Sequence, residues 1–91
     1  METVHLEVEG RVQGVGFRWY VVEKAEQLGI RGWVRNRPDG RVEIAAAGAR
    51  PALEKLEAAI REGPRGARVE AVRSLGPVDA GSISPSFEIV R

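Results

Sequence analysis

Residues 4–18 read Val4-His5-Leu6-Glu7-Val8-Glu9-Gly10-Arg11-Val12-Gln13-Gly14-Val15-Gly16-Phe17-Arg18. The beginning of this stretch alternates apolar and polar residues, which is the period of a strand with one buried face. Three glycines then interrupt the alternation. From Phe17 onward, apolar residues recur at helical spacing, at Val21, Ala25 and Leu28, as far as Gly29. The stretch therefore predicts a strand, a glycine loop and an amphipathic helix in succession.

The rest of the chain continues as short segments separated by Gly and Pro. Pattern and turn residues predict, in order, a strand at 30–36, a turn at 37–40, a strand at 41–48, a helix at 51–62, a strand at 67–75, a loop at 77–85 and a strand at 87–89. In residues 67–75 the apolar residues do not stay on alternate positions. We therefore expect an edge strand with a bulge there, in a register that the sequence leaves open. The order β-α-β-β-α-β plus a short C-terminal strand predicts an α+β fold, the ferredoxin-like sandwich, in which two helices cover one face of an antiparallel sheet.

Side chains alternate between the two faces of a strand, so the sequence divides the expected sheet into a helix-covered face and an open face. The residues assigned to the helices are Val4, Leu6, Val8, Val34, Val42 and Ile44. The residues assigned to water are His5, Glu7, Glu9, Trp33, Arg35, Arg37, Arg41 and Glu43. RNA-recognition modules on this fold stack bases on strand aromatics, whereas here only Trp33 could stack and the carboxylates would repel phosphates. We therefore expect a solvated, charge-paired face and no nucleic-acid partner.

Length and composition exclude several classes of protein. Ninety-one residues predict one domain, 1–91, with a core that needs no disulfide. The absence of Cys and the single His5 exclude thiol catalysis, thiolate metal sites and histidine clusters. The net charge of +1 argues against bulk attraction to nucleic acid. With no basic leader and no apolar run approaching about 18 residues, we expect a soluble, cytoplasmic protein, and a monomer because the sheet uses the apolar stripes of both helices.

The chain is rich in arginine, with twelve Arg against two Lys, and it has a single Asn and no Cys. This bias fits a thermophilic source and a GC-rich coding genome equally well. Its local consequence concerns the single asparagine. Asn36 becomes a candidate functional residue because a chain that otherwise avoids this side chain has kept one.

The glycine loop predicts an anion site. It leaves a strand and enters a helix N-terminus, where unpaired amides and the positive end of the helix dipole attract an oxyanion such as phosphate. The loop lacks the Lys-Ser/Thr pair of a Walker loop and the spacing of a dinucleotide fingerprint. Spacing alone favours a purely structural turn, because glycines turn chains for many reasons.

Two side chains could complete such a site. Arg18 lies at the helix start, where a cation is unfavourable unless an anion compensates it, and its guanidinium fork fits phosphoryl oxygens. Asn36 has the parity of Val34, which directs its amide to the helix side of the sheet, near the start of the first helix. From position alone, however, Asn36 also fits the residue that opens the turn before Pro38.

Together these residues resemble the acylphosphatase family. The resemblance is carried by Gly10-Arg11-Val12-Gln13-Gly14-Val15-Gly16-Phe17-Arg18, by Gly32-Trp33-Val34-Arg35-Asn36 and by the Pro-Asp-Gly turn, and it runs along essentially the whole chain. It implies a metal-independent hydrolase that needs no cofactor and converts acyl phosphates to carboxylate and inorganic phosphate. A non-catalytic phosphate- or nucleic-acid-binding module on the same fold is the alternative.

The resemblance also implies roles for individual residues. Arg18 and Asn36 would be the catalytic residues, with Arg18 on the phosphoryl group and Asn36 on the attacking water. The phosphoryl group would also be bound by the backbone amides of the loop, namely Val12, Gln13, Gly14, Val15, Gly16, Phe17 and Arg18. No residue of the sequence obviously selects the acyl half of a substrate.

Overall fold

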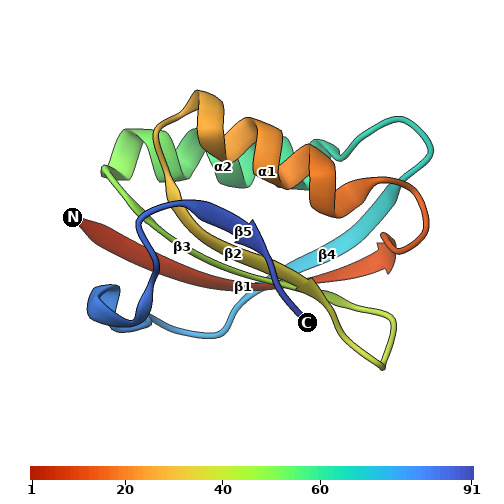
Figure 1. Ribbon diagram of the computed structural model, residues 1–91. Coiled ribbons are helices and arrows are strands. Elements are labelled where there is room, and N and C mark those ends of the chain that lie inside the picture. Colours follow the sequence, from red (N-terminus) through yellow and green to blue (C-terminus); the bar gives the residue numbers. More distant parts are fainter.

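The computed structural model describes all of residues 1–91 and has the predicted order of elements (Figure 1). The strands are β1 (Glu2–Arg11), β2 (Arg31–Asn36), β3 (Val42–Gly48), β4 (Arg68–Ser74) and β5 (Phe87–Ile89). The helices are α1 (Phe17–Gln27), α2 (Arg50–Glu62) and the short 3₁₀ helix η1 (Ala80–Ser82). The 3₁₀ helix lies inside the segment that the sequence predicted as a loop.

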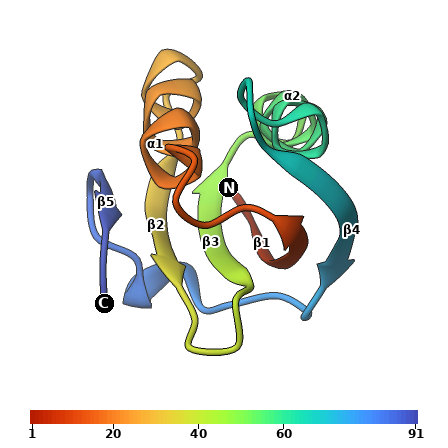
Figure 2. The same cartoon turned by 90° about the vertical axis from the view of Figure 1, so that its right-hand side faces the viewer.

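The strands form one sheet in the order β4-β1-β3-β2-β5. As predicted, β1 pairs antiparallel with β3 and with β4, and β2 pairs antiparallel with β3. The last strand differs, because β5 lies parallel to β2 at the edge of the sheet. Both helices cover the same face of the sheet (Figure 2). The ferredoxin-like sandwich is therefore confirmed, with a sheet that is mixed rather than wholly antiparallel.

The hydrophobic core lies between the helices and the sheet. The strand residues predicted to face the helices are buried there, except that Val4 is only half-buried. α1 contributes Phe17 and Val21, and α2 contributes Leu56 and Ile60, each at most 1% exposed. Because burial of one such side chain contributes about 1.5–3 kcal/mol, these stripes fix both helices on the sheet and with them the start of α1.

The predicted bulge lies where β1 pairs with the edge strand β4. Glu9 is opposite Ala71 but Gly10 is opposite Val69, so Glu70 is an extra residue on β4. Gly10 has a φ of 133°, and a Cβ at this position would lie 2.1 Å from the carbonyl oxygen of Arg68. Only glycine therefore fits at this close approach, and one residue later, after Arg11, the chain leaves the sheet and enters the glycine loop.

The prediction of an open second face was wrong for half of the sheet. The crossover from β4 to β5, residues 75–86, runs over this face to the opposite edge (Figure 1). Thr3 Oγ1 donates a hydrogen bond to the carbonyl of Val78 at 2.8 Å and accepts one from its amide at 3.2 Å. On this face Ala47, opposite Thr3, is 0% exposed, whereas Ala45 is 1% exposed and lies between His5 and Trp33, whose ring centroids are 6.0 Å apart. Strand parity does not reveal this cover because it is made by a segment without a repeating pattern.

The other half of the second face carries a network of ion pairs. At its centre Glu43 is 7% exposed, and its carboxylate lies 2.5 Å from His5 Nε2 and 2.6 Å from Arg35 Nη2. Around it, Glu7 pairs with Arg37 at 2.7 Å, and further arginines pair with Glu9. Charge pairing was predicted correctly, but Glu43 is buried and not solvated as expected, because its cross-strand neighbours surround it.

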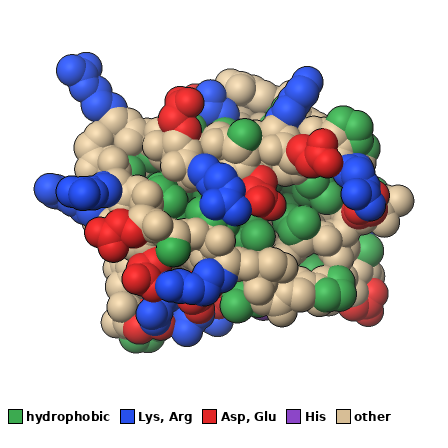
Figure 3. Space-filling view, turned by 180° about the vertical axis from the view of Figure 1, so that it is seen from behind, with side chains coloured by type: hydrophobic (Ala, Val, Ile, Leu, Met, Phe, Trp, Pro, Cys, Tyr) green, Lys and Arg blue, Asp and Glu red, His purple; other side chains and the backbone are tan.

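The exposed surface carries both signs of charge. Figure 3 shows the side that carries α2 and β4, where acidic and basic side chains are interspersed and neither forms a continuous field. This distribution agrees with the net charge of +1. Neither α1 nor α2 is long and apolar enough to cross a membrane.

The pH dependence of stability tests the role of Glu43. Burial raises the pKa of this carboxyl, but hydrogen bonds from His5 and Arg35 outweigh burial and hold the pKa below its usual 4.5. The ionised form therefore stabilises the fold above about pH 5, and this contribution is lost as the pH falls from 4.5 through the folded pKa.

We expect Glu43→Gln to lower the free energy of unfolding at neutral pH by about 2 kcal/mol, because charged hydrogen bonds are replaced by weaker neutral ones. The difference from the unmodified protein should shrink as the pH falls toward about 3. Urea denaturation across this range measures it, with Glu23→Gln, an exposed carboxyl on α1 with no ion pair, as the control. A difference that stays constant with pH would contradict this account.

Candidate functional site

The loop between β1 and α1 is held at both ends by buried side chains. Val12 and Phe17 are each 1% exposed and belong to the core. Between them, Gly14 and Gly16 have φ values of 75° and 78°, while Val15 has a negative φ. Such alternation of the sign of φ turns successive main-chain N–H groups toward a common centre, which is the geometry of an anion-binding nest.

The amides of this loop have no partner within the protein. None of the N–H groups from Val12 to Trp19 donates a hydrogen bond to the main chain or to a side chain. The first bond of α1 runs from the Tyr20 amide to the carbonyl of Gly16 at 3.1 Å. Gly16 caps the helix without a side-chain acceptor, and the first turn holds no acidic residue. The positive end of α1 and the loop amides therefore form one site suited to an oxyanion.

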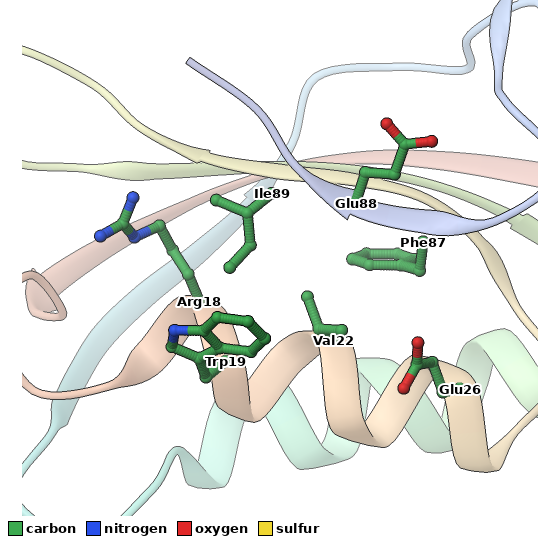
Figure 4. Close-up of a pocket in the computed structure, with 7 residues that line it drawn as sticks. All are labelled: Arg18, Trp19, Val22, Glu26, Phe87, Glu88 and Ile89. Atoms are coloured by element: carbon green, nitrogen blue, oxygen red, sulfur yellow. The ribbon is translucent and has the colours of Figure 1, made fainter.

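Arg18 adds a full positive charge to this end of the helix. Its side chain is exposed and forms no ion pair or hydrogen bond, in contrast to Arg37 and Arg41, which are held by carboxylates. In Figure 4 its side chain rises from α1 toward the sheet, and its guanidinium is turned to the side away from Ile89. An unpaired cation at a helix N-terminus is unfavourable by itself, so a bound anion would stabilise it.

Asn36 is the last residue of β2 and lies opposite Val42. Since opposed residues share a face of the sheet, its side chain lies on the helix-covered face with the buried Val42, as its parity predicted. Its Oδ1 is buried and has no hydrogen-bond partner. An unpaired buried acceptor costs about 1–3 kcal/mol, which a donating water or ligand would recover.

The turn after β2 does not use the Asn36 side chain. The turn is closed by the Gly40 amide on the carbonyl of Arg37, by the Arg37 amide on the carbonyl of Arg41, and by Asp39, whose carboxylate accepts from the Arg41 amide. The alternative role that the sequence left open, a side chain that opens the turn, therefore has no hydrogen bond to support it.

Gln13 ties the glycine loop to this turn. Its Nε2 donates to the carbonyls of Arg37 at 2.8 Å and of Arg41 at 3.0 Å. Sequence reasoning considered only the main-chain amide of Gln13, because no local pattern indicates a partner so far along the chain. The side chain fixes the loop beside the end of β2, where Asn36 lies.

The structure thus gathers the predicted residues at one end of the molecule. α1 begins and β2 ends on the side that faces the viewer in Figure 2, with the glycine loop between them. No group of three or more His, Asp or Glu side chains lies in positions that could hold a metal ion. The arrangement offers main-chain donors, one guanidinium and one carboxamide oxygen, a set that can hold an oxyanion and a water molecule.

Sequence reasoning missed a groove next to Arg18. It has a volume of about 640 Å³ and lies between α1 and β5 (Figure 4). Its lining residues are Arg18, Trp19, Val22, Glu26, Phe87, Glu88 and Ile89. The missing information was the parallel pairing of β5, which brings the C-terminal strand beside the helix.

Comparison with known proteins gives consistent matches. The family model Acylphosphatase matches residues 4–89. An acylphosphatase of Koribacter versatilis (strain Ellin345) is 56% identical over 78% of this chain and 64% of its own length, and one of Salinibacter ruber (strain DSM 13855 / M31) is 47% identical over 93% and 85%. The crystal structure of acylphosphatase from Bacillus subtilis is similar over the whole of both chains, with a TM-score of 0.93 and 37% identity.

The tie through Gln13 can be tested by denaturation. We expect Gln13→Ala to lower the free energy of unfolding by about 1–2 kcal/mol, because two hydrogen bonds between the loop and the turn are lost. Gln27→Ala, an exposed glutamine at the end of α1, should change it by less than about 0.5 kcal/mol. Equal stabilities of the two variants in urea would show that the Gln13 side chain does not hold the loop.

Proposed function

The chain belongs to the acylphosphatase family, and from this premise we propose how its residues hydrolyse an acyl phosphate. The reaction of the family converts the carboxyl-phosphate bond to a carboxylate and inorganic phosphate, and the protein is an enzyme of this kind. We propose that Arg18 and Asn36 are its catalytic residues. The observation that carries the proposal is the run of unpartnered amides from Val12 to Trp19 beside an unpaired arginine.

The phosphoryl group is bound by the loop amides of residues 12–18 and by the Arg18 guanidinium. The amides converge on one oxyanion, and the guanidinium fork donates two parallel hydrogen bonds to it. These donors are already in place before substrate arrives, so charge that develops on the phosphoryl oxygens is stabilised without rearrangement. The positive charge that a metal would otherwise supply comes from Arg18 and the helix, and the proposed reaction therefore uses no metal and no cofactor.

Asn36 positions the attacking water. Its buried Oδ1, which has no partner in the protein, accepts a hydrogen bond from the water and aims the water oxygen at phosphorus. A carboxamide cannot take up a proton near neutral pH, so the water proton passes to a phosphoryl oxygen of the substrate. As the new P–O bond forms, the bond to the acyl oxygen breaks and the carboxylate leaves. A carboxylate is a good leaving group at neutral pH because its conjugate acid has a pKa of about 4.

The proposal extends to the setting in which the enzyme works. We propose that residues 1–91 act as one domain and as a monomer, which is supported by the single core cluster and by the crossover that covers half of the second face of the sheet. We also propose a cytoplasmic location, because acyl phosphates are charged, short-lived compounds that would be met where they are made. Its partners are an acyl phosphate and inorganic phosphate, with no nucleic acid and no membrane.

Substitution of Arg18 tests phosphoryl binding. We expect Arg18→Ala to lower kcat/KM for benzoyl phosphate by about 10²- to 10³-fold and to weaken competitive inhibition by phosphate. Arg18→Lys should not restore activity, because an ammonium lacks the planar fork. The measurement is phosphate release in the presence of EDTA, with Arg65→Ala, an exposed arginine without an ion pair, as the control. Absence of phosphate release by the unmodified protein would instead identify a non-catalytic binding module.

Substitution of Asn36 separates water positioning from phosphoryl binding. We expect Asn36→Ala to lower kcat by about 10²- to 10³-fold, the cost of losing one preorganised group, while the inhibition constant of phosphate stays nearly the same. Its free energy of unfolding should be equal or higher, because the variant removes a buried acceptor that has no partner. Steady-state kinetics and urea denaturation give the two values. A variant that turns over at the full rate would exclude Asn36 from the mechanism.

A further inference from the structure

The groove beside Arg18 has a charged end, an apolar floor and an aromatic wall. Its floor is formed by Val22 of α1 and Phe87 of β5, which are 8% and 6% exposed. Its wall is Trp19, whose large and mostly apolar side chain is 71% exposed. Figure 4 shows these side chains turned toward one another across the gap between helix and strand. A volume of about 640 Å³ lies within the range of small-molecule sites.

The two ends of the groove carry opposite charge. Arg18, Val22 and Glu26 follow one another at intervals of four residues and therefore lie along one face of α1. Eight residues of helix place Glu26 about 12 Å from Arg18, measured along the axis. The other acidic residue of the lining, Glu88, is turned away from the groove, and its carboxylate accepts hydrogen bonds from Ser84 and Ser86 at 3.0 Å. The apolar stretch is therefore bounded by a cation at one end and by a single carboxylate at the other.

We propose that this groove, the acyl groove, binds the acyl half of the substrate and selects neutral apolar acyl groups, aromatic ones above all. The inference rests on the proposed function, because it takes Arg18 as the residue that holds the phosphoryl group. The groove is continuous with that residue, so the carbon skeleton of a substrate bound there has an apolar surface beside it. An acyl group carrying a terminal carboxylate would bring a second negative charge nearer to Glu26 and be disfavoured by repulsion across the groove.

The side chains that line the groove explain which acyl groups are favoured and by how much. An aromatic ring beside Trp19 gains the edge or offset contact that aromatic pairs favour, in addition to the burial of its own surface. An acetyl group is too short to cover the floor formed by Val22 and Phe87. Glu26 is exposed, so its repulsion of a second carboxylate is screened and amounts to a few-fold in rate rather than to orders of magnitude.

The test compares two substrates across matched variants. We expect Trp19→Ala to lower kcat/KM for benzoyl phosphate about tenfold more than it lowers kcat/KM for acetyl phosphate, mainly through KM. Leu75→Ala, which removes another exposed apolar side chain in the crossover on the far face, should leave the ratio of the two substrates unchanged. At low salt, Glu26→Gln should raise kcat/KM for succinyl phosphate about threefold relative to benzoyl phosphate.

The outcomes distinguish failure of the groove from failure of the proposed function. If the unmodified protein hydrolyses both substrates but Trp19→Ala leaves their ratio unchanged, the acyl groove is wrong and the hydrolase stands. If neither substrate releases phosphate, both proposals fall. A second copy of the chain could occupy the groove instead of an acyl group, and sedimentation at assay concentration tests this alternative. A dimer that dissociates on Trp19→Ala would mean that a second copy fills the groove, and would overturn the inference.

Discussion

The main-chain amides between β1 and α1 have no hydrogen-bond acceptor in the protein. The rest of the site depends on how the fold leaves these amides unpaired. Buried or converging N–H groups are normally paired, because leaving them unpaired costs free energy. Here β1 pairs with β4 only as far as Arg11, one residue beyond the bulge at Gly10, and Gly16 caps α1 without offering an acceptor. The loop amides therefore have neither a strand carbonyl nor a capping side chain to bind. The amides remain available for an oxyanion, and the helix dipole adds to their attraction.

Several groups at this end of the molecule are individually unfavourable to stability. Arg18 places a cation at the positive end of a helix, and Asn36 buries a carbonyl oxygen without a donor. Elsewhere the same chain satisfies its polar groups closely: Glu43 is buried between two partners, and Gln13 donates two hydrogen bonds. The contrast is the usual one between a scaffold that is optimised for stability and a site that gives up stability for binding. The contrast supports the proposed site independently of any motif.

Much of the fold could be predicted because its pattern is local. The alternation in β1 and the helical spacing after Phe17 each follow from neighbouring residues, and so does the bulge in β4, which showed as a loss of parity. The loop amides and the face of Asn36 followed from the same reasoning. What escaped prediction depends on partners far apart in the chain. Thr3 holds the crossover at Val78, and Gln13 reaches the turn at Arg37, and neither contact has a signature in the residues around it.

The crossover links these observations, because it does more than close the sheet. It carries the chain across the second face from the β4 edge to the β2 edge, where β5 pairs parallel to β2. That parallel pairing sets Phe87 and Ile89 opposite α1 and so creates the groove beside Arg18. In the proposed enzyme, substrate selectivity would thus be set by the C-terminal segment, and the chemistry by the first helix and its loop.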